Sequence, residues 1–185
     1  MRILERALSL ACAAALAAGL SVVQPGMAMA QSNAPAVQTG PSGLPLPRFV
    51  SLRSSRANLR VGPGTNYAVQ WQYVRAGIPL EIIQEYDNWR RVRDVDGTVG
   101  WLNQSLLSGS RTAIVAPWER GRTDELQLHA QANESSRIVA RLEPGLIGDI
   151  RSCNGDWCEM NFSGVRGWIP QSRIWGAYPG ETYRD

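Results

Sequence analysis

The chain has 185 residues, of which 44% are hydrophobic and 19% are charged, and a formal net charge of +3 at pH 7. All 19 basic residues are arginine, but such a small net charge does not indicate a surface for nucleic acid. We therefore expect no nucleic-acid partner.

The first 30 residues have the pattern of a secretory signal peptide. Arg2 and Arg6 precede the apolar run ALSLACAAALAAGLSVV, and residues 28–30 (AMA) supply an A-x-A cleavage site. An uncleaved membrane anchor is the alternative, but a transmembrane helix needs about 20 apolar residues with suitable flanks. The signal-peptide pattern therefore predicts an exported protein, which has no stable membrane span once residues 1–30 are removed.

Residues 31–47 (QSNAPAVQTGPSGLPLP) are predicted to form a disordered tether. The segment contains four prolines, few large apolar side chains and no charge. Such a composition buries too little apolar surface to order the chain. The folded region is expected to start at residue 48.

An internal repeat divides this folded region. The stretch GWLNQSLL at residues 100–107 returns as GWIPQSRI at 167–174, and Ile82 matches Ile150 at nearly the same offset. Because the match extends over a whole domain length, it indicates two tandem copies of one fold. We predict that the first copy spans residues 48–115, the linker 116–125 and the second copy 126–180.

Each copy consists of short β-prone runs separated by Gly, Pro, Asn or Asp. In the first copy these runs are ANLRV, WQYV, LEIIQEY, WRRVR and TVGWL. No segment has a sustained helical stripe of apolar residues, so the pattern predicts an all-β barrel or sandwich. One tight helical turn is expected after each repeated GW pair, because Asn103 and Ser105 favour local capping bonds.

Tryptophan is the expected core residue of both copies. The chain has seven tryptophans, and a copy of about 60 residues needs a dense core to be stable. We expect Trp89, Trp101, Trp157 and Trp168 in the core or at the mouth of a barrel, in preference to a ligand role. Trp89 lies three residues from Val92, so strict alternation cannot put both on one face. Either a β-bulge intervenes or the tryptophan lies at the mouth.

Cys153 and Cys158 bracket a four-residue loop. In a hairpin with such a loop the two residues face each other at a distance suitable for a disulfide, and export favours oxidation. Glu85 and Arg90 occupy the same positions in the first copy and are expected to form an ion pair across the strands. The disulfide is predicted to contribute about 2 kcal/mol, against roughly 0 to 1 kcal/mol for an exposed ion pair.

A series of motifs runs through the first copy in a fixed order. Asn58-Leu59-Arg60 is followed by Gly-Pro-Gly-Thr at residues 62–65, and then by EYDNW, DGTVGWL, NQSLL and RTAIV. This series resembles the bacterial SH3 domains found in exported proteins of proteobacteria. The second copy resembles a diverged version, with ARLEPG, CNGDWC and GVRGWIP, but it lacks the Gly-Pro-Gly loop.

The resemblance implies two tandem SH3-like barrels, each with five to seven strands. It also implies a binding module for cell-wall or peptide ligands in the periplasm of a Gram-negative envelope. A ligand loop built on Gly-Pro-Gly is expected in the first copy and is in doubt in the second.

Catalysis needs a nucleophile or an acid–base pair. Four carboxylates could approach each other as such a pair, but surface solvation explains them more simply: Glu81, Glu85, Asp94 and Asp96. His129 is the single histidine of the sequence and falls on a predicted strand, while both mature cysteines are assigned to the bridge. Zinc requires roughly three or four ligands, which this set does not provide. The Gly-Pro-Gly loop lacks the lysine and helix of a phosphate loop. We expect no enzyme activity, no metal and no cofactor.

Aromatic side chains and arginines of the first copy form the candidate binding surface. Aromatic faces stack on sugars or proline-like turns, and arginine binds carboxylates. The predicted ligand-binding residues are Tyr67, Trp71, Tyr73, Tyr86 and Arg91. Peptidoglycan offers carboxylates beside a glycan, so the expected partner is peptidoglycan or a cell-envelope peptide. The alternative is a scaffold that binds an envelope protein and does not touch the wall.

In the linker, Trp118 is predicted to wedge between the copies.

Overall fold

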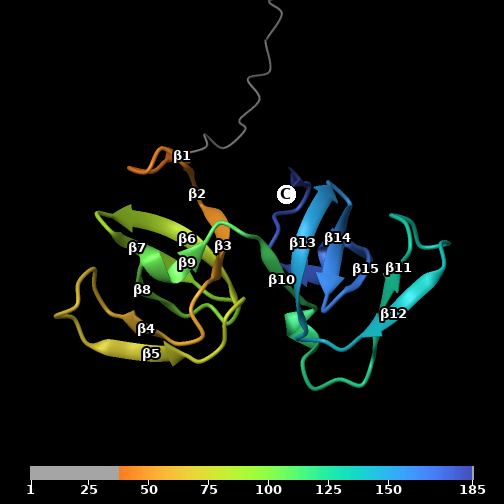
Figure 1. Ribbon diagram of the computed structural model, residues 1–185, viewed down its shortest axis with the longest axis horizontal. Helices are drawn as coiled ribbons and strands as arrows, with labels where there is room; N and C mark the ends of the chain where they lie inside the picture. Colours follow the sequence, from red (N-terminus) through yellow and green to blue (C-terminus); the bar gives the residue numbers. More distant parts are fainter. Residues whose placement is uncertain (1–37, 185) are drawn as a thin grey trace, which may run out of the picture. The chain divides into compact units, whose positions relative to one another are not determined.

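The computed structural model describes residues 38–184 (Figure 1). Its strands form a two-stranded ribbon and two larger antiparallel sheets, of seven and eight strands. Within the described residues there is no α-helix, and the helical segments are three 3₁₀ turns. The predicted signal peptide and the tether residues before Gln38 lie outside the described residues.

The first sheet has the strand order β5-β4-β8-β7-β6-β3-β9. Its elements are β3 (Arg48–Leu52), β4 (Ala57–Arg60), β5 (Val69–Tyr73), β6 (Pro79–Tyr86), β7 (Trp89–Arg93), β8 (Val99–Asn103), η1 (Gln104–Leu106) and β9 (Leu107–Ser108).

The second sheet has the order β12-β11-β15-β14-β13-β10-β16, and β17 pairs with β13. Its elements are β10 (Thr112–Val115), η2 (Pro117–Glu119), β11 (Leu126–His129), β12 (Ile138–Leu142), β13 (Ile147–Asn154), β14 (Trp157–Phe162), β15 (Val165–Pro170), η3 (Gln171–Arg173), β16 (Ile174–Trp175) and β17 (Thr182–Arg184). The repeated strand order confirms two tandem SH3-like all-β bodies. Each strand path is open, running between two edge strands, and is not a closed ring.

Strand β10 lies inside the range predicted for the first copy, 48–115. It pairs with β13 and β16, and so holds in the second sheet the place that β3, paired with β6 and β9, holds in the first. The sheets therefore divide before Thr112. The run TAIV is apolar and β-prone in either copy, and its membership is decided by long-range pairing.

Aliphatic side chains make up most of both cores, joined by Tyr73 in the first and Phe162 in the second, and the expectation of tryptophan cores is wrong. No tryptophan of the described residues is buried, whereas Leu59, Val92 and Leu102 are 0% exposed. On β7 the buried Arg90 and Val92 alternate with the half-buried Trp89, so the indole lies on the outer face. A bulge does occur, but in β6 opposite β7.

The glycine of the repeated GW pair allows neighbouring strands to approach closely. A Cβ added to Gly100 would lie 2.5 Å from Leu59 Cγ, and one added to Gly167 would lie 2.7 Å from Leu128 Cγ. A side chain at either position would push β8 from β4, or β15 from β11. The same packing requirement in both copies explains why the pair is repeated.

The repeated glutamine joins each 3₁₀ turn to a hairpin. The backbone N–H of Gln104 donates to Asn88 O (2.9 Å), and that of Gln171 donates to Asp156 O (2.7 Å). The side chains reach the same strand position in both copies: Gln104 Oε1 accepts from Arg90 Nη2 (2.5 Å), and Gln171 Nε2 lies 3.7 Å from Cys158 Sγ. These bonds confirm the predicted helical turns and give the Gln a structural role.

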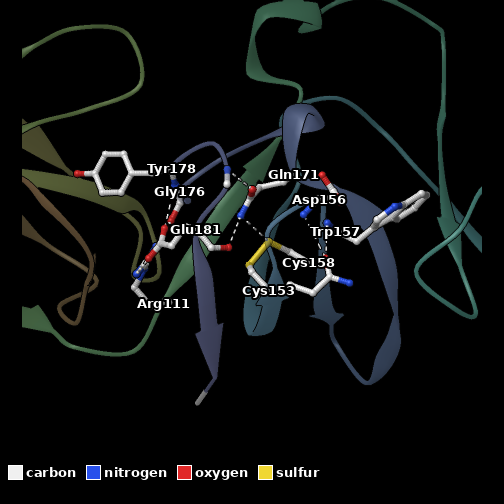
Figure 2. The surroundings of a disulfide bond; sticks show 11 residues. Arg111, Cys153, Asp156, Trp157, Cys158, Gln171, Gly176, Tyr178 and Glu181 are labelled. Atoms are coloured by element: carbon white, nitrogen blue, oxygen red, sulfur yellow. Dashed lines mark hydrogen bonds and ion pairs between the residues drawn. A yellow bond between two sulfur atoms is a disulfide. The ribbon is translucent and has the colours of Figure 1, made fainter. Parts of the chain in front are cut away.

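The two hairpins are stapled as predicted. Cys153 and Cys158 are register partners with Cα atoms 4.1 Å apart and form a disulfide, which Figure 2 shows beside Gln171. Glu85 and Arg90 are the corresponding partners, with Arg90 Nε 3.3 Å from Glu85 Oε1. The ion pair is buried, with side chains 9% and 1% exposed, so the weak, exposed pair assumed from the sequence is wrong.

Residues 38–47, predicted as disordered tether, are ordered. Strands β1 (Gln38–Thr39) and β2 (Pro45–Leu46) pair with each other, and Leu46 packs against the first core. Between them Ser42 donates from N and Oγ to Glu85, both at 2.8 Å. Composition alone missed this order because a buried carboxylate distant in sequence supplies the acceptors.

Trp118 does not act as the predicted wedge, since it is 57% exposed. Phe49 of β3 instead contacts aromatic residues of the second copy: its ring centroid lies 5.0 Å from that of Trp175 in β16 and 4.7 Å from that of Tyr178, which follows β16. Tyr178 also donates from its hydroxyl to Glu81 Oε1 (2.9 Å). Burial, followed by this bond to the Glu81 carboxylate, raises the pKa of Tyr178 above its ordinary value.

Candidate functional site

A hollow of about 360 Å³ opens on the outer face of the first sheet; we name it the first pocket. Its lining comes from β4, β5, β7, β8, η1 and the loops beside β4. The lining residues are Arg56, Ala57, Asn58, Arg60, Thr65, Gln72, Trp89, Asn103 and Leu106.

Strand alternation places the polar lining of β4. Ala57 and Leu59 are buried in the core, so Asn58 and Arg60 point outward. Arg60 Nη1 donates to Tyr67 O at 2.6 Å, and Asn58 Oδ1 accepts from Gln72 Nε2 at 2.7 Å. These bonds hold the guanidinium and the two amides in fixed positions.

The η1 turn closes one side of the pocket. Asn103 Oδ1 accepts from Ser105 N (3.0 Å) and Ser105 Oγ (2.8 Å), and so caps the turn as the sequence predicted. Its β7 partner in register is Trp89, whose half-buried indole forms an apolar wall. The first pocket thus combines an aromatic surface with amide groups.

The charge of the first pocket is positive. Its lining contains Arg56 and Arg60 and no carboxylate. Neither guanidinium has an ion pair within residues 38–184. Arginine forms bidentate hydrogen bonds with carboxylates and phosphates. The arrangement therefore suits an anionic group carried on a ligand with a flat or apolar part.

The five predicted ligand-binding residues do not line one common pocket. Trp71, Tyr86 and Tyr67 are exposed by 56%, 60% and 43%, and lie on β5, at the end of β6 and in the loop after β4. Arg91 is exposed on β7, 3.5 Å from Gln84 Oε1. None of the five predicted residues, Tyr73 included, lines the first pocket.

Tyr73 belongs to the core. It is 5% exposed, and its hydroxyl donates to Asp94 Oδ2 at 3.0 Å. Burial, and then the Asp94 carboxylate, raise the pKa of Tyr73 well above its ordinary value. Tyr73 and Trp71 both line a separate groove of about 550 Å³, but the Tyr73 hydroxyl already donates its hydrogen bond to Asp94.

Arg56, Asn58 and Trp89 line the first pocket but are not among the predicted binding residues. Two features of the sequence point to them. Asn58 and Arg60 alternate with the apolar Ala57 and Leu59, and the odd spacing between Trp89 and Val92 removes the indole from the core face.

Among residues 38–184, no group of three or more His, Cys, Asp or Glu side chains is placed to hold a metal ion. The same part of the chain contains no helix of the length and apolarity that membrane crossing requires.

Comparison with known proteins gives a family and a few distant structural likenesses. No curated protein matches the chain. The structures of NlpC2 and NlpC1 from Trichomonas vaginalis are each 12% identical, with TM-scores of 0.32 and 0.31. They align with 71% and 69% of this chain, which spans only 48% and 45% of theirs. The model of the bacterial SH3 domain matches residues 53–109 and again 123–176. The chain therefore belongs to the bacterial SH3 domain family, with two tandem copies of the domain.

Proposed function

We propose that the protein is a non-catalytic, exported binding module whose first pocket recognises an anionic group of peptidoglycan or of a cell-envelope peptide. The observation that carries this proposal is the pairing of Arg56 and Arg60 with the Trp89 wall, in a lining free of carboxylates. Family membership supports a wall-associated binding role, and the N-terminal sequence supports export.

The first pocket is preorganised for such a ligand. Arg60 is oriented by its bond to Tyr67 O, so less side-chain freedom is lost when a carboxylate binds. Trp89 offers a flat face for a sugar ring or a peptide turn, and the pocket amides add donors. Binding and orientation are the whole of this role, and we assign no residue to bond making or breaking.

The test is co-sedimentation of the purified protein with peptidoglycan sacculi at low and moderate salt. Arg56→Gln combined with Arg60→Gln should weaken binding by about tenfold, in line with two exposed charge-assisted contacts. Arg166→Gln is the matched control, because it removes an exposed arginine of β15 outside the first pocket. Binding that is equally weakened by the control would show a general charge effect.

Absence of sedimentation at low salt would contradict wall binding. The chain would then be better described as a scaffold for an envelope protein. Turnover of a wall substrate by the purified protein would contradict the non-catalytic role.

A further inference from the structure

The second sheet has a hollow of its own, of about 450 Å³; we name it the second pocket. It is lined by Glu125, Leu126, Gln127, His129, Glu134, Ile169, Pro170 and Arg173. These residues come from β11, β15, η3 and the loops beside β11.

Strand register shows that the two pockets are equivalent. His129 pairs with Trp168 as Arg60 pairs with Trp101. Because His129 and Arg60 are equivalent, the residues that precede them also correspond: Gln127 takes the place of Asn58, and Glu125 takes the place of Arg56.

The same holds on the opposite wall of the second pocket. Pro170 pairs with Trp157 as Asn103 pairs with Trp89. The second pocket therefore lies at the same position in the fold as the first pocket but is lined by different side chains.

The substitutions reverse the charge. The two arginines of the first pocket are replaced by Glu125 and His129, and the loop adds Glu134. Arg173 is neutralised by Glu119, with Nη2 2.8 Å from Oε2. Glu134 has no ion pair within residues 38–184, and Glu125 has only Arg141 at 3.9 Å.

His129 supplies an independent reason to expect a ligand. The residue is only 5% exposed. Its imidazole packs edge-on against the Trp157 indole, with the ring centroids 5.4 Å apart. His129 also lines the second pocket. Nδ1 lies 3.4 Å from Ser136 O, and for Nε2 no protein hydrogen bond is found in the described part of the chain. The tautomer that donates from Nδ1 leaves Nε2 as an acceptor.

We propose that the second pocket binds an organic cation, specifically a primary ammonium group carried by a peptide or amino sugar. An ammonium has three donors and no acceptor. The second pocket offers matching acceptors on Glu125, Glu134, Gln127 and His129 Nε2. The proposal goes beyond the function assigned to the first pocket and does not depend on it.

The test uses two-dimensional ¹H–¹⁵N NMR of the purified chain, titrated with Nα-acetyl-lysine methylamide. The amides of β11 and of residues 133–136 should shift in a saturable manner. Nα-acetyl-glutamate methylamide, an anion of similar size, should leave them unchanged. Because Glu125 and Glu134 are exposed, Glu125→Gln with Glu134→Gln should fold normally and raise the dissociation constant for the lysine probe about tenfold.

Glu143→Gln is the matched control, since this exposed glutamate lies outside the second pocket. An unchanged dissociation constant in the double Gln variant would overturn the proposal. So would equal binding of the glutamate probe at β11, or absence of saturable shifts there. The glutamate probe reports separately on the amides of β4, so failure of the second pocket is distinguishable from failure of the first.

Discussion

Replacement of Glu85 by Gln tests the electrostatic staple of the first hairpin. The carboxylate, 1% exposed, lies 2.6 Å from Arg48 Nη2 and 3.3 Å from Arg90 Nε. Ser42 donates to it from N and Oγ. Burial by itself raises the pKa of Glu85, but the hydrogen bonds from Ser42 and Arg48 outweigh it and lower the pKa from 4.5 to about 2.

The lowered pKa fixes the sign and size of the effect. The charged form is favoured in the folded state, so its contribution is fully present above pH 4.5 and is lost as the pH falls toward about 2. At 1.36 kcal/mol per pKa unit, the difference corresponds to roughly 3 kcal/mol. Glu85→Gln should lower the free energy of unfolding at pH 7 by about this amount, because the buried Arg90 also loses its counterion.

The assay is urea unfolding of the two proteins at several pH values between 2 and 7, followed by tryptophan fluorescence. The wild-type protein should lose stability on acidification more steeply than Glu85→Gln, by roughly 3 kcal/mol over the range. Glu143→Gln, an exposed glutamate, serves as the control and should follow the wild type. Parallel pH profiles for Glu85→Gln and the wild type would refute the reasoning.

Three further predictions concern the packing of each sheet. Cys153→Ala with Cys158→Ala should lower the free energy of unfolding by about 2 kcal/mol, measured in urea, because the short closed loop is freed in the unfolded state; a change near zero would contradict the staple. Tyr73→Phe should cost about 1 to 3 kcal/mol in the same assay, since Asp94 Oδ2 loses a buried donor; unchanged stability would show that the bond contributes nothing. Gly100→Ala should cost roughly 1 to 3 kcal/mol and raise amide exchange in β4 and β8, because the added methyl meets the neighbouring strand; a neutral effect would remove the packing explanation of the repeated GW pair.

The duplicated architecture was predictable because it depends on local patterns. The repeated GW and QS pairs, the short β-prone runs and the spacing of Cys153 and Cys158 each encode a strand, a turn or a hairpin. Even the exchange of a disulfide for Glu85 and Arg90 follows from aligning the two copies. All of these features were confirmed by strand register.

The features of the fold and of the first pocket that depend on long-range strand pairing were not predicted from the sequence. Thr112–Val115 and Ser42 are placed by partners far away in sequence, so neither composition nor periodicity assigned them correctly. The tryptophans were misplaced because residue size suggested a core role, whereas strand alternation puts Trp89 on the face opposite Val92. The first pocket was not predicted because its lining consists of outward-facing residues on several strands, which only long-range pairing brings together.

The most direct test of the proposed function is the dissociation constant for peptidoglycan sacculi of the wild type beside the variant carrying Arg56→Gln and Arg60→Gln. We predict measurable wild-type binding, weakened about tenfold in the double variant and unchanged in Arg166→Gln. Equal binding by wild type and double variant would contradict the assignment of the first pocket as the anion site.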